Sequence, residues 1–283
     1  MKHLSRRERS WSDRMISGSR SAMYGAAEPP RLWGWRTRFF WKNTLLRSAS
    51  NTPLISVYVP THNRADLLLT RALPSIRAQT YKNLEIIVAC HGCTDGTARR
   101  VRVLNDPRIR VLDVPRKQTY PPTAENHWLA GPVVPANAAL KAVRGDWIVR
   151  LDDDDELLPD HVEVLLRAAQ AGGYEFISGA YERERDGVRE ILSDDGEDPP
   201  AGGVQTWMYR SYLKFMRYNS KCYLKRWNAV NDSDLVDRFR KAGVRMGHID
   251  RVVARVLPRP GETTVGLQAY QRDQEATERR FAF

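Results

Sequence analysis

The sequence predicts an α/β fold in which a mostly parallel, Rossmann-like sheet is flanked by helices. Short apolar runs rich in β-branched residues alternate along the chain with segments whose apolar residues recur at helical spacing. Strands that alternate with helices fold through right-handed crossovers, which place the strands parallel to one another. Polar residues directly follow several of the apolar runs, at the sheet edge where folds of this class bind ligands.

The expected strands of the first half of the chain lie at residues 54–59, 84–89, 109–112 and 147–151. The first of them is expected to end at Pro60. Two further strands, at 174–181 and 188–192, are expected to form a hairpin because Asp186-Gly187 between them is a turn signal. The carboxyl ends of the strands, just after residues 59, 89 and 151, are therefore the first places to expect functional residues.

The expected helices lie at residues 65–79, 95–104, 136–143, from beyond Pro159 to about 170, and 233–242. Pro74 is expected to kink the first of these helices, and Thr94 to cap the second. Gly243 follows the end of the last one. The five prolines of residues 115–135 predict a loop there, and residues 193–203 predict a second loop.

Composition favours a soluble domain with a proper core. The chain has 283 residues, of which 42% are hydrophobic, and this length predicts one large domain or a domain with an appendage. No apolar run reaches the length of a membrane-spanning helix, and the N-terminus lacks the apolar stretch of a secretory signal. Three cysteines in a chain this long do not predict a disulfide framework. We therefore expect a cytoplasmic protein, with peripheral contact at the inner face of the membrane as an option.

The positive charge is concentrated at the N-terminus. The net charge is +11, and residues 1–50 contain 11 Lys or Arg against 3 Asp or Glu. The rest of the chain is therefore close to neutral, and nucleic acid is not an expected partner of the main domain. Residues 1–30 are polar and are expected to be disordered or loosely attached. Residues 31–48 interleave five aromatic residues with basic ones, which fits either an interfacial membrane helix or a helix packed on the protein's own surface.

An acidic run, Asp152 to Asp155, directly follows the strand at 147–151. Four adjacent carboxylates repel one another, and a hard divalent cation relieves that repulsion. Oxygen ligands are those that Mn and Mg prefer, and a cation held by them can bind a diphosphate leaving group. The alternative is a solvated loop with helix-capping carboxylates. The position at the end of a central strand favours the metal site.

Four blocks of sequence, in this order, together resemble the family-2 inverting glycosyltransferases, whose nucleotide-sugar-binding domain has the A-type (GT-A) fold. The blocks are ISVYVPTHNRADLL at 55–68, NLEIIVACHGCTDGT at 83–97, NAALKAVRGDWIVRLDDDDELLPDHVEVL at 137–165, and WNAVNDSDLVDRFRKAGVRMGHID at 227–250, followed by RPGETT at 259–264. The resemblance implies a metal-dependent transfer of a sugar, with inversion, from a nucleotide-sugar donor to an acceptor hydroxyl in glycan or glycoconjugate synthesis. The acceptor would be a glycan, a lipid-linked molecule or another alcohol.

The resemblance also implies roles for residues. The donor lies over the loop after the first strand, which is formed by Pro60, Thr61, His62, Asn63 and Arg64. The Asp-x-Asp motif of the family corresponds to Asp152, Asp153 and Asp154. Within it, Asp154 is the metal ligand, Asp152 lies near the ribose and diphosphate and supports the metal, and Asp153 belongs to the donor-binding set.

The general base of the family corresponds to Asp232, with Asp234 as a second choice whose alternative role is to cap the following helix. Arg259 corresponds to an arginine in the mobile C-terminal loop that covers the donor, and its fork suits a diphosphate. These assignments divide the chain into a basic N-terminal extension at 1–50, a catalytic domain at 51–265 and a tail at 266–283. Within the catalytic domain, 51–155 is the nucleotide-binding half and 156–265 the acceptor half.

Two departures from the family pattern bear on specificity. Cys90-His91 stands where the family has the carboxylates that read the base, so the donor nucleotide stays open. Asn231 replaces the usual Glu before Asp232. The Cys90-x-x-Cys93 pair also allows a zinc site, with Cys222 and His248 as the two further ligands, or a redox pair, although small polar residues in a nucleotide-facing loop explain it more simply.

Two other functions remain as alternatives. Nucleotidyl transfer also uses carboxylates, a metal and an α/β sheet, but residues 60–64 lack the Gly-rich loop that it favours. A non-catalytic binding module could dock through the basic N-terminal extension, although the intact acidic run argues against it. The sequence does not fix the oligomeric state.

Overall fold

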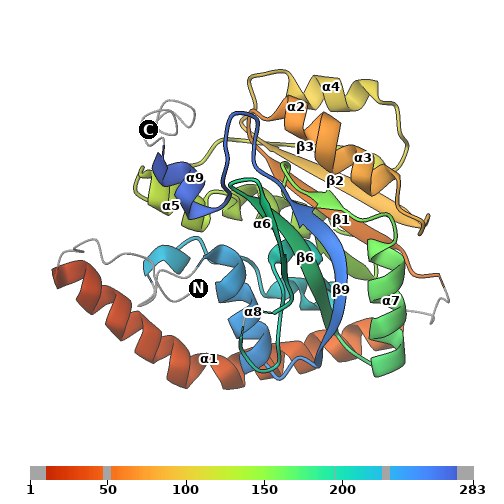
Figure 1. Cartoon of the computed structure of the whole chain (residues 1–283). Coiled ribbons are helices and arrows are strands. Elements are labelled where there is room, and N and C mark those ends of the chain that lie inside the picture. Colours follow the sequence, from red (N-terminus) through yellow and green to blue (C-terminus); the bar gives the residue numbers. More distant parts are fainter. Residues whose placement is uncertain (1–10, 47–51, 195, 225–229, 273–283) are drawn as a thin grey trace.

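The computed structural model describes residues 11–46, 52–194, 196–224 and 230–272. A nine-stranded sheet runs through the molecule in the order β3-β2-β1-β4-β8-β6-β9-β5, with β7 paired to β6 (Figure 1). The strands are β1 Ile55–Thr61, β2 Leu84–His91, β3 Ile109–Val114, β4 Trp147–Arg150, β5 Glu156–Leu157, β6 Phe176–Arg185, β7 Val188–Leu192, β8 Met208–Arg210 and β9 Met246–Val256.

Helices cover both faces of this sheet. They are α1 Trp11–Leu46, α2 Ala65–Leu67, the π-helical turn η1 Leu68–Ala72, α3 Leu73–Arg77, α4 Thr97–Val103, α5 Ala124–Ala130, α6 Val133–Ala142, α7 His161–Gly172, α8 Asn231–Lys241, α9 Leu267–Arg272, and the short 3₁₀ turns η2 Val204–Thr206, η3 Ser211–Phe215 and η4 Cys222–Leu224. The predicted α/β class with a mostly parallel sheet is confirmed.

Strand direction brings the functional edge of the sheet together. β1 pairs in parallel with β2 and with β4, and β2 pairs in parallel with β3. The short β8 is antiparallel to both of its neighbours, β4 and β6, so β6 points the same way as β4. β9 is parallel to β6. The carboxyl ends of β1, β2, β4, β6 and β9 therefore lie along one edge of the sheet.

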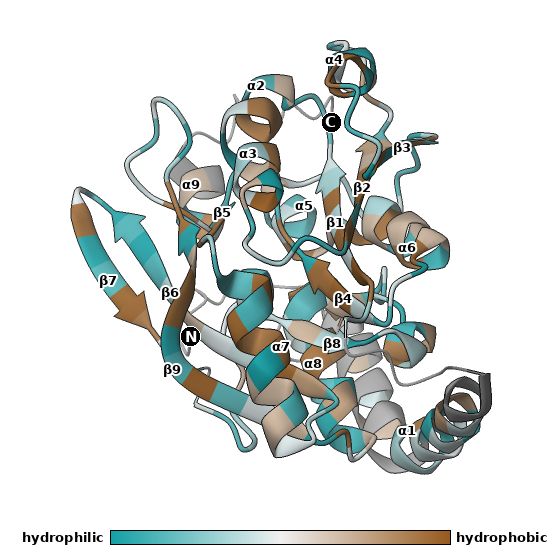
Figure 2. Ribbon diagram, turned by 90° about the vertical axis from the view of Figure 1, so that its right-hand side faces the viewer, coloured by the Kyte–Doolittle hydropathy of each residue, from teal (hydrophilic) through white to brown (hydrophobic). Residues whose placement is uncertain are grey.

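The core forms on both faces because most side chains of the central strands are apolar and buried. Val57 and Val59 of β1 pack on the face covered by α3 and α7, whereas Tyr58 between them packs on the face covered by α6 and α8. All three side chains have no exposed surface. Strands buried on both faces are typical of parallel sheets. Figure 2 shows this pattern as hydrophobic colour on β1, β2 and β4 between the helix layers.

Most expected elements of the body are present within a few residues of their predicted bounds, including the hairpin turn, where Asp186 and Gly187 both adopt positive φ. The loop expected at 115–135 is wrong, because α5 and the start of α6 lie there. The Thr123 side chain caps α5 by accepting from the Asn126 N–H. The prolines at 132 and 135 fall at the start of α6, where a backbone N–H is not needed.

Smaller corrections concern strand and helix ends. Thr94 is not the cap of α4; Gly96, at φ 79°, precedes that helix, and Asp95 accepts from the Thr97 N–H at 3.0 Å. β1 does not stop at Pro60 but continues to Thr61. Before Pro74, the expected kink takes the form of the π-helical turn η1.

The N-terminal extension is more ordered than expected. Residues 11–30 belong to α1, which continues through Pro29 and Pro30, so the expectation of disorder is wrong there. Residues 1–10 lie outside the described residues. From residue 31 onwards α1 packs on the domain, with Leu32 against the core and Phe39 stacked on Phe215. Among the described residues, no helix combines the length and apolar character needed to cross a membrane.

Candidate active site

A cleft of about 650 Å³ opens at the edge of the sheet where the parallel strands end. Each of β1, β2, β4, β6 and β9 contributes residues to it, at or just after its carboxyl end. The lining contains the predicted Pro60, Thr61, His62, Arg64, His91, Asp152, Asp153, Asp154, Asp232 and Arg259. Segments far apart in the sequence therefore meet in one cavity.

The acidic run is neutralised by arginines. Arg64 donates to Asp153 at 2.8 Å and to Asp154 at 3.0 Å. Asp153 also accepts from the Thr61 hydroxyl at 2.7 Å, and its side chain is 5% exposed, against 21% for Asp154. Asp152 accepts from Arg150 at 2.9 Å. The charge repulsion expected among these carboxylates is thus reduced from within the protein.

Burial separates the members of the run. It raises the pKa of Asp153 to about 6, although the adjacent Arg64 acts in the opposite direction. Burial, followed by the neighbouring Asp154, raises the pKa of Asp155 well above its usual range. Asp152 and Asp154 keep partly exposed carboxylates at the cleft. These two are therefore the members best placed to meet a ligand.

Carboxylate oxygens are the ligands that Mg and Mn prefer, and Asp152 and Asp154 offer them at the cleft. No group of three or more His, Cys, Asp or Glu side chains in the described part of the chain is arranged to hold a metal. Mg is commonly held by one or two carboxylates together with substrate phosphates, so a pair suffices when a diphosphate is present. The donor set fits a metal that binds with its substrate.

Asp232 lies in the cleft at the first turn of α8. Burial raises the pKa of its carboxyl group above the usual value, and Arg150 opposes that shift. Asp234 does not line the cleft; its side chain is fully buried and pairs with Arg238 at 2.7 Å. The geometry therefore separates the two base candidates, because only Asp232 can reach a bound molecule.

Arg150 connects the acidic run to α8. It is 2% exposed, and its guanidinium donates through Nε to Asp152 at 2.9 Å and through Nη1 to Asn231 Oδ1 at 2.8 Å. The ring of Tyr218 lies 5.1 Å from its central carbon. Asn231 in turn donates to the Leu129 carbonyl at 3.1 Å. The amide at position 231 therefore serves as acceptor and donor at once, which a carboxylate could not do.

The loop after β1 is tied to the loop after β2. Asn63, at φ 50°, accepts from the Thr94 N–H at 2.7 Å and does not line the cleft. His62 Nδ1 lies 2.6 Å from the His91 carbonyl oxygen. Cys90 is 2% exposed and belongs to the core, so of the Cys90-His91 pair only His91 lines the cleft.

The protonation state of His91 follows from its surroundings. Burial, with His62 and Arg116 nearby, lowers the pKa of His91 to about 4, so the ring is neutral near pH 7. Its Nε2 accepts from the Lys117 N–H at 3.1 Å, which places the ring proton on Nδ1. The three cysteines are free thiols, with Cys222 buried beside Leu129 rather than near the other two.

The C-terminal loop closes one side of the cleft. Arg259 is 8% exposed and donates to Glu262 at 2.7 Å. Arg71 donates to the backbone carbonyls of Asp154 and Pro258, which joins this loop to the acidic run. At its other end the Thr263 hydroxyl donates to Asp186 at 2.8 Å, at the tip of the β6–β7 hairpin.

The wall opposite the donor loops carries basic residues. Side chains alternate along β6, and Tyr181, Arg183 and Arg185 line the cleft. Glu182, one of the residues between them, instead pairs with Arg189 and Arg255. Tyr181 lies in the field of Asp232, so the basic wall adjoins the base candidate.

Sequence patterns had not indicated Arg150, this wall, or the residues from the 115–135 segment in the lining. Arg150 carried one signal: a charged residue in an apolar strand that leads directly into the acidic run. The residues of the 115–135 segment were expected to form a loop. The wall residues lie on a strand, and its alternation of Glu and Arg does not tell which side chains face the cleft.

A family model described as Glycosyl transferase family 2 matches residues 56–239, more than half of the chain. The chain belongs to glycosyl transferase family 2. The predicted family, and the predicted enzyme class of glycosyltransferases of the hexosyltransferase type, are thereby confirmed at the level of the family.

Curated relatives match this family 2 chain over part of its length. A putative colanic acid biosynthesis glycosyl transferase, WcaA from Escherichia coli, is 34% identical over 122 residues, which cover 42% of this chain and 39% of the relative. A GalNAc(5)-diNAcBac-PP-undecaprenol beta-1,3-glucosyltransferase from Campylobacter jejuni is 34% identical over 137 residues, covering 48% and 40%. The matches thus span about two fifths of these relatives.

Solved structures of low sequence identity share the fold of this family 2 chain. S. aureus TarS in complex with UDP-GlcNAc aligns with a TM-score of 0.56 at 18% identity, covering 74% of this chain and 60% of TarS. The mannosyltransferase PcManGT from Pyrobaculum calidifontis, in complex with GDP-Man and Mn2+, aligns with a TM-score of 0.55 at 16% identity, covering 95% and 72%. The predicted GT-A fold is confirmed.

Proposed function

We propose that this family 2 chain transfers a sugar, with inversion and with a divalent cation, from a nucleotide-sugar to an acceptor hydroxyl in glycan or glycoconjugate synthesis. The observation that carries the proposal is the meeting of Asp152 and Asp154 with Asp232 in one cleft. The first two come from the end of β4, and the third comes from the first turn of α8. The nucleotide-binding half is proposed as residues 51–155 and the acceptor half as 156–265, within a catalytic domain of 51–265 followed by a tail.

The roles follow from position and charge. Asp232 accepts the proton of the acceptor hydroxyl as that oxygen attacks the anomeric carbon from the face opposite the nucleotide. Its raised pKa makes it a better proton acceptor than an ordinary Asp. A Mn or Mg ion bound by Asp154 and Asp152 would supply Lewis acidity to the departing diphosphate. Arg64 and Arg259 bind oxygens of that diphosphate, and Pro60, Thr61 and His62 form the surface beneath the nucleotide.

His91 is proposed to contact the base of the donor. Because its ring is neutral with the proton on Nδ1, it can donate to a carbonyl group of the base. TarS is described with UDP-GlcNAc and PcManGT with GDP-Man, so the fold accepts more than one base. A screen of UDP-, GDP- and CDP-sugars, with release of the nucleoside diphosphate as the readout, identifies the donor of this chain.

The acceptor is proposed to be a glycan or a lipid-linked saccharide, as the name of the Campylobacter jejuni relative indicates for that protein. The basic wall of Arg183 and Arg185 suits an acceptor that bears a negative charge. We place the enzyme in the cytoplasm, peripheral to the inner face of the membrane through residues 31–48, with no nucleic acid partner.

The test compares three Asp→Asn variants with the wild type in the presence and absence of Mn. Asp232→Asn is expected to lower kcat by about 10²–10⁴-fold, because general base catalysis contributes about that much. Asp154→Asn is expected to remove the stimulation by Mn. Asp237→Asn serves as the control, since this residue lies on α8 and pairs with Lys241 outside the cleft.

Circular dichroism checks that the variants fold. Near wild-type turnover of Asp232→Asn would overturn the assignment of the base. Proton NMR of the anomeric centre tests inversion, and retained configuration would exclude the proposed single displacement. Release of pyrophosphate instead of nucleoside diphosphate would favour nucleotidyl transfer, and no release from any donor would favour a binding module.

A further inference from the structure

The helix α1 is fixed to the domain by one face. Four positions at helical spacing contact the body: Leu32 packs on the core, Arg36 pairs with Glu175, Phe39 stacks on Phe215 with centroids 4.9 Å apart, and Phe40 meets Tyr212 edge-on at 5.7 Å. In Figure 1 the helix runs along the side of the molecule remote from α4.

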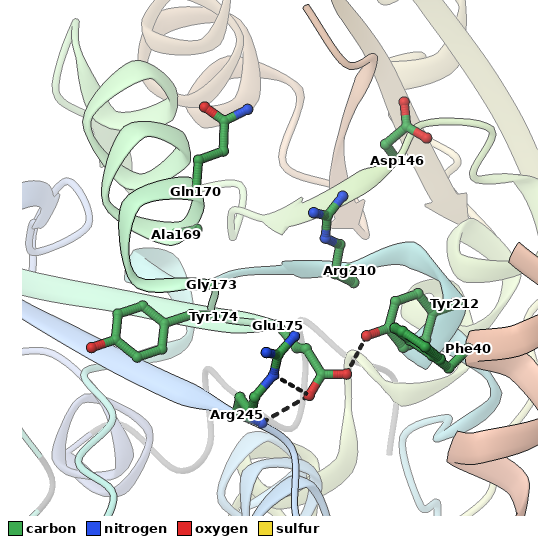
Figure 3. A pocket seen from close by; sticks show the side chains of 10 residues that line it. All are labelled: Phe40, Asp146, Ala169, Gln170, Gly173, Tyr174, Glu175, Arg210, Tyr212 and Arg245. Carbon is green, nitrogen blue, oxygen red and sulfur yellow. Dashed lines mark hydrogen bonds and ion pairs between the residues drawn. The ribbon is translucent and has the colours of Figure 1, made fainter. Parts of the chain in front are cut away.

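The anchor of this face is a buried carboxylate. Glu175 is 2% exposed and accepts from the Tyr212 hydroxyl and from the Arg245 backbone N–H (Figure 3). It also accepts from Arg36. Burial alone would raise the pKa of Glu175, but these hydrogen bonds lower it below the usual value. The ionised anchor holds α1 in one orientation on the domain, so its outward face is defined.

That outward face carries large apolar side chains. Met15, Met23, Trp33 and Trp41 are 57%, 70%, 59% and 58% exposed, and we name them the α1 apolar stripe. Met15 and Trp33 are eighteen positions apart, as are Met23 and Trp41, which is about five turns at 3.6 residues per turn. The two pairs lie about 80° apart around the axis, so the four side chains form one stripe along the helix.

Basic side chains lie beside the stripe on the side away from the domain. Arg31 and Arg38 are exposed, and they are seven positions apart, about two turns. Within α1 as a whole there are six Lys or Arg and two Asp or Glu. A helix with exposed Trp along one stripe and Arg along the next matches the boundary between lipid headgroups and acyl chains.

We propose that the α1 apolar stripe inserts into the surface of an anionic lipid bilayer while Arg31 and Arg38 bind headgroup phosphates. A second copy of the chain is the less favourable occupant, because pairing two α1 helices would bring like charges together. The proposal rests on the proposed peripheral location of the enzyme and specifies which side chains of α1 contact the lipid. It is tested without any sugar donor, so its failure and the failure of the proposed activity are separate results.

The experiment is co-sedimentation of the full chain with vesicles of phosphatidylcholine, with and without phosphatidylglycerol. The wild type is expected to bind the anionic vesicles, and less strongly as salt rises. Arg31→Gln with Arg38→Gln should weaken that binding about thirtyfold, from about 1 kcal/mol for each basic residue near an anionic surface. Trp33→Ser with Trp41→Ser should weaken it by at least about tenfold.

The matched control is Val103→Ser on α4, which removes an apolar side chain that is 77% exposed on another part of the surface. It should bind vesicles as the wild type does. Equal binding of the Trp33→Ser/Trp41→Ser variant and the wild type overturns the proposal, as does failure of the wild type to prefer anionic vesicles. A dimer in solution that this double variant dissociates, with no vesicle binding, assigns the stripe to a second copy instead.

Discussion

At the scale of single residues, the site depends on Arg150, a buried arginine beside the carboxylates. Removing a charge from water is costly unless the charge is paired and hydrogen-bonded, and Arg150 is 2% exposed. Its planar fork satisfies Asp152 with one nitrogen and Asn231 with another. Arg150 thereby fixes the distance between the proposed metal-side carboxylate and the residue next to Asp232.

Replacing Arg150 with Lys tests this positioning. The charge remains, but a single ammonium group cannot reproduce two bonds in divergent directions. We expect kcat to fall about tenfold or more, because misplacement of reacting groups by even 1 Å can cost about a hundredfold. Arg108→Lys is the control: Arg108 makes a comparable double contact with Asp106, away from the cleft, and this variant should keep its kcat. Equal kcat values for the two variants would contradict the positioning role of Arg150.

The sequence allowed the carboxylates of the cleft to be predicted but not their partners. Asp152 and Asp154 follow a strand directly, and strand ends in parallel sheets share one edge, so local order was sufficient. Arg64 lies in the loop after β1 at that same edge, and the family resemblance assigned it to the donor. Arg183 and Arg185 reach the cleft only because β8 enters between β4 and β6, a long-range pairing that no local pattern specifies.

At the scale of elements, the β6–β7 hairpin and the C-terminal loop support each other. Asp186 is at φ 50° in the hairpin turn, where Asp and Asn are tolerated better than most residues. Its carboxylate accepts from the Thr263 hydroxyl, and its N–H donates to the Thr263 carbonyl. The loop that carries Arg259 therefore depends on the hairpin tip for its position.

Asp186→Ala should raise the KM for the donor about three- to tenfold with little change in kcat, because Arg259 is then held less firmly. Asp186→Asn keeps an oxygen acceptor and the tolerance of positive φ, so it should remain close to the wild type. A double-mutant cycle with Thr263→Val measures the coupling directly. Strictly additive effects on KM would show that the hairpin and loop do not act through this contact.

Elements were predictable where local chemistry agreed with the final packing. Most residues of β1, β2 and β4 are apolar, and the Asp186-Gly187 turn defines its hairpin. The prolines of 115–135 led to the wrong prediction of a loop. Proline disrupts the interior of a helix, but it is tolerated in the first turn. α1 was missed over residues 11–30 because this segment is polar and ends in Pro29-Pro30, which the helix nevertheless includes.

At the scale of the whole molecule, stability is expected to depend on the neutrality of a buried histidine. His161 at the start of α7 is fully buried, and its Nδ1 hydrogen-bonds the Val253 carbonyl of β9 at 3.0 Å. Its Nε2 has no hydrogen-bond partner in the described part of the chain. Burial lowers the pKa of His161 to about 4, below the usual 6.5. Protonation would place a second N–H in a site without an acceptor.

The sign of the pH effect follows. Between about pH 6.5 and pH 4 the unfolded chain binds a proton at His161 and the folded chain does not, so the free energy of unfolding decreases as pH falls. The decrease reaches about 3 kcal/mol at pH 4, with full stability above pH 6.5. His161→Asn keeps a donor toward Val253 and should remove this part of the pH dependence. Urea unfolding at several pH values measures it, and parallel curves for both proteins would contradict the assignment.

The hydrogen bonds that join the loops after β1 and β2 affect the thermodynamics of ligand binding. The Asn63 side chain accepts from the Thr94 N–H, and Asp95 accepts from both the Ala65 N–H at 3.1 Å and the Thr97 N–H. Each loop thus satisfies backbone groups of the other, and the two are ordered before any ligand arrives. Because their conformational entropy is already lost on folding, binding at this end of the cleft has little ordering cost, and contacts made there contribute almost fully to discrimination between one base and another.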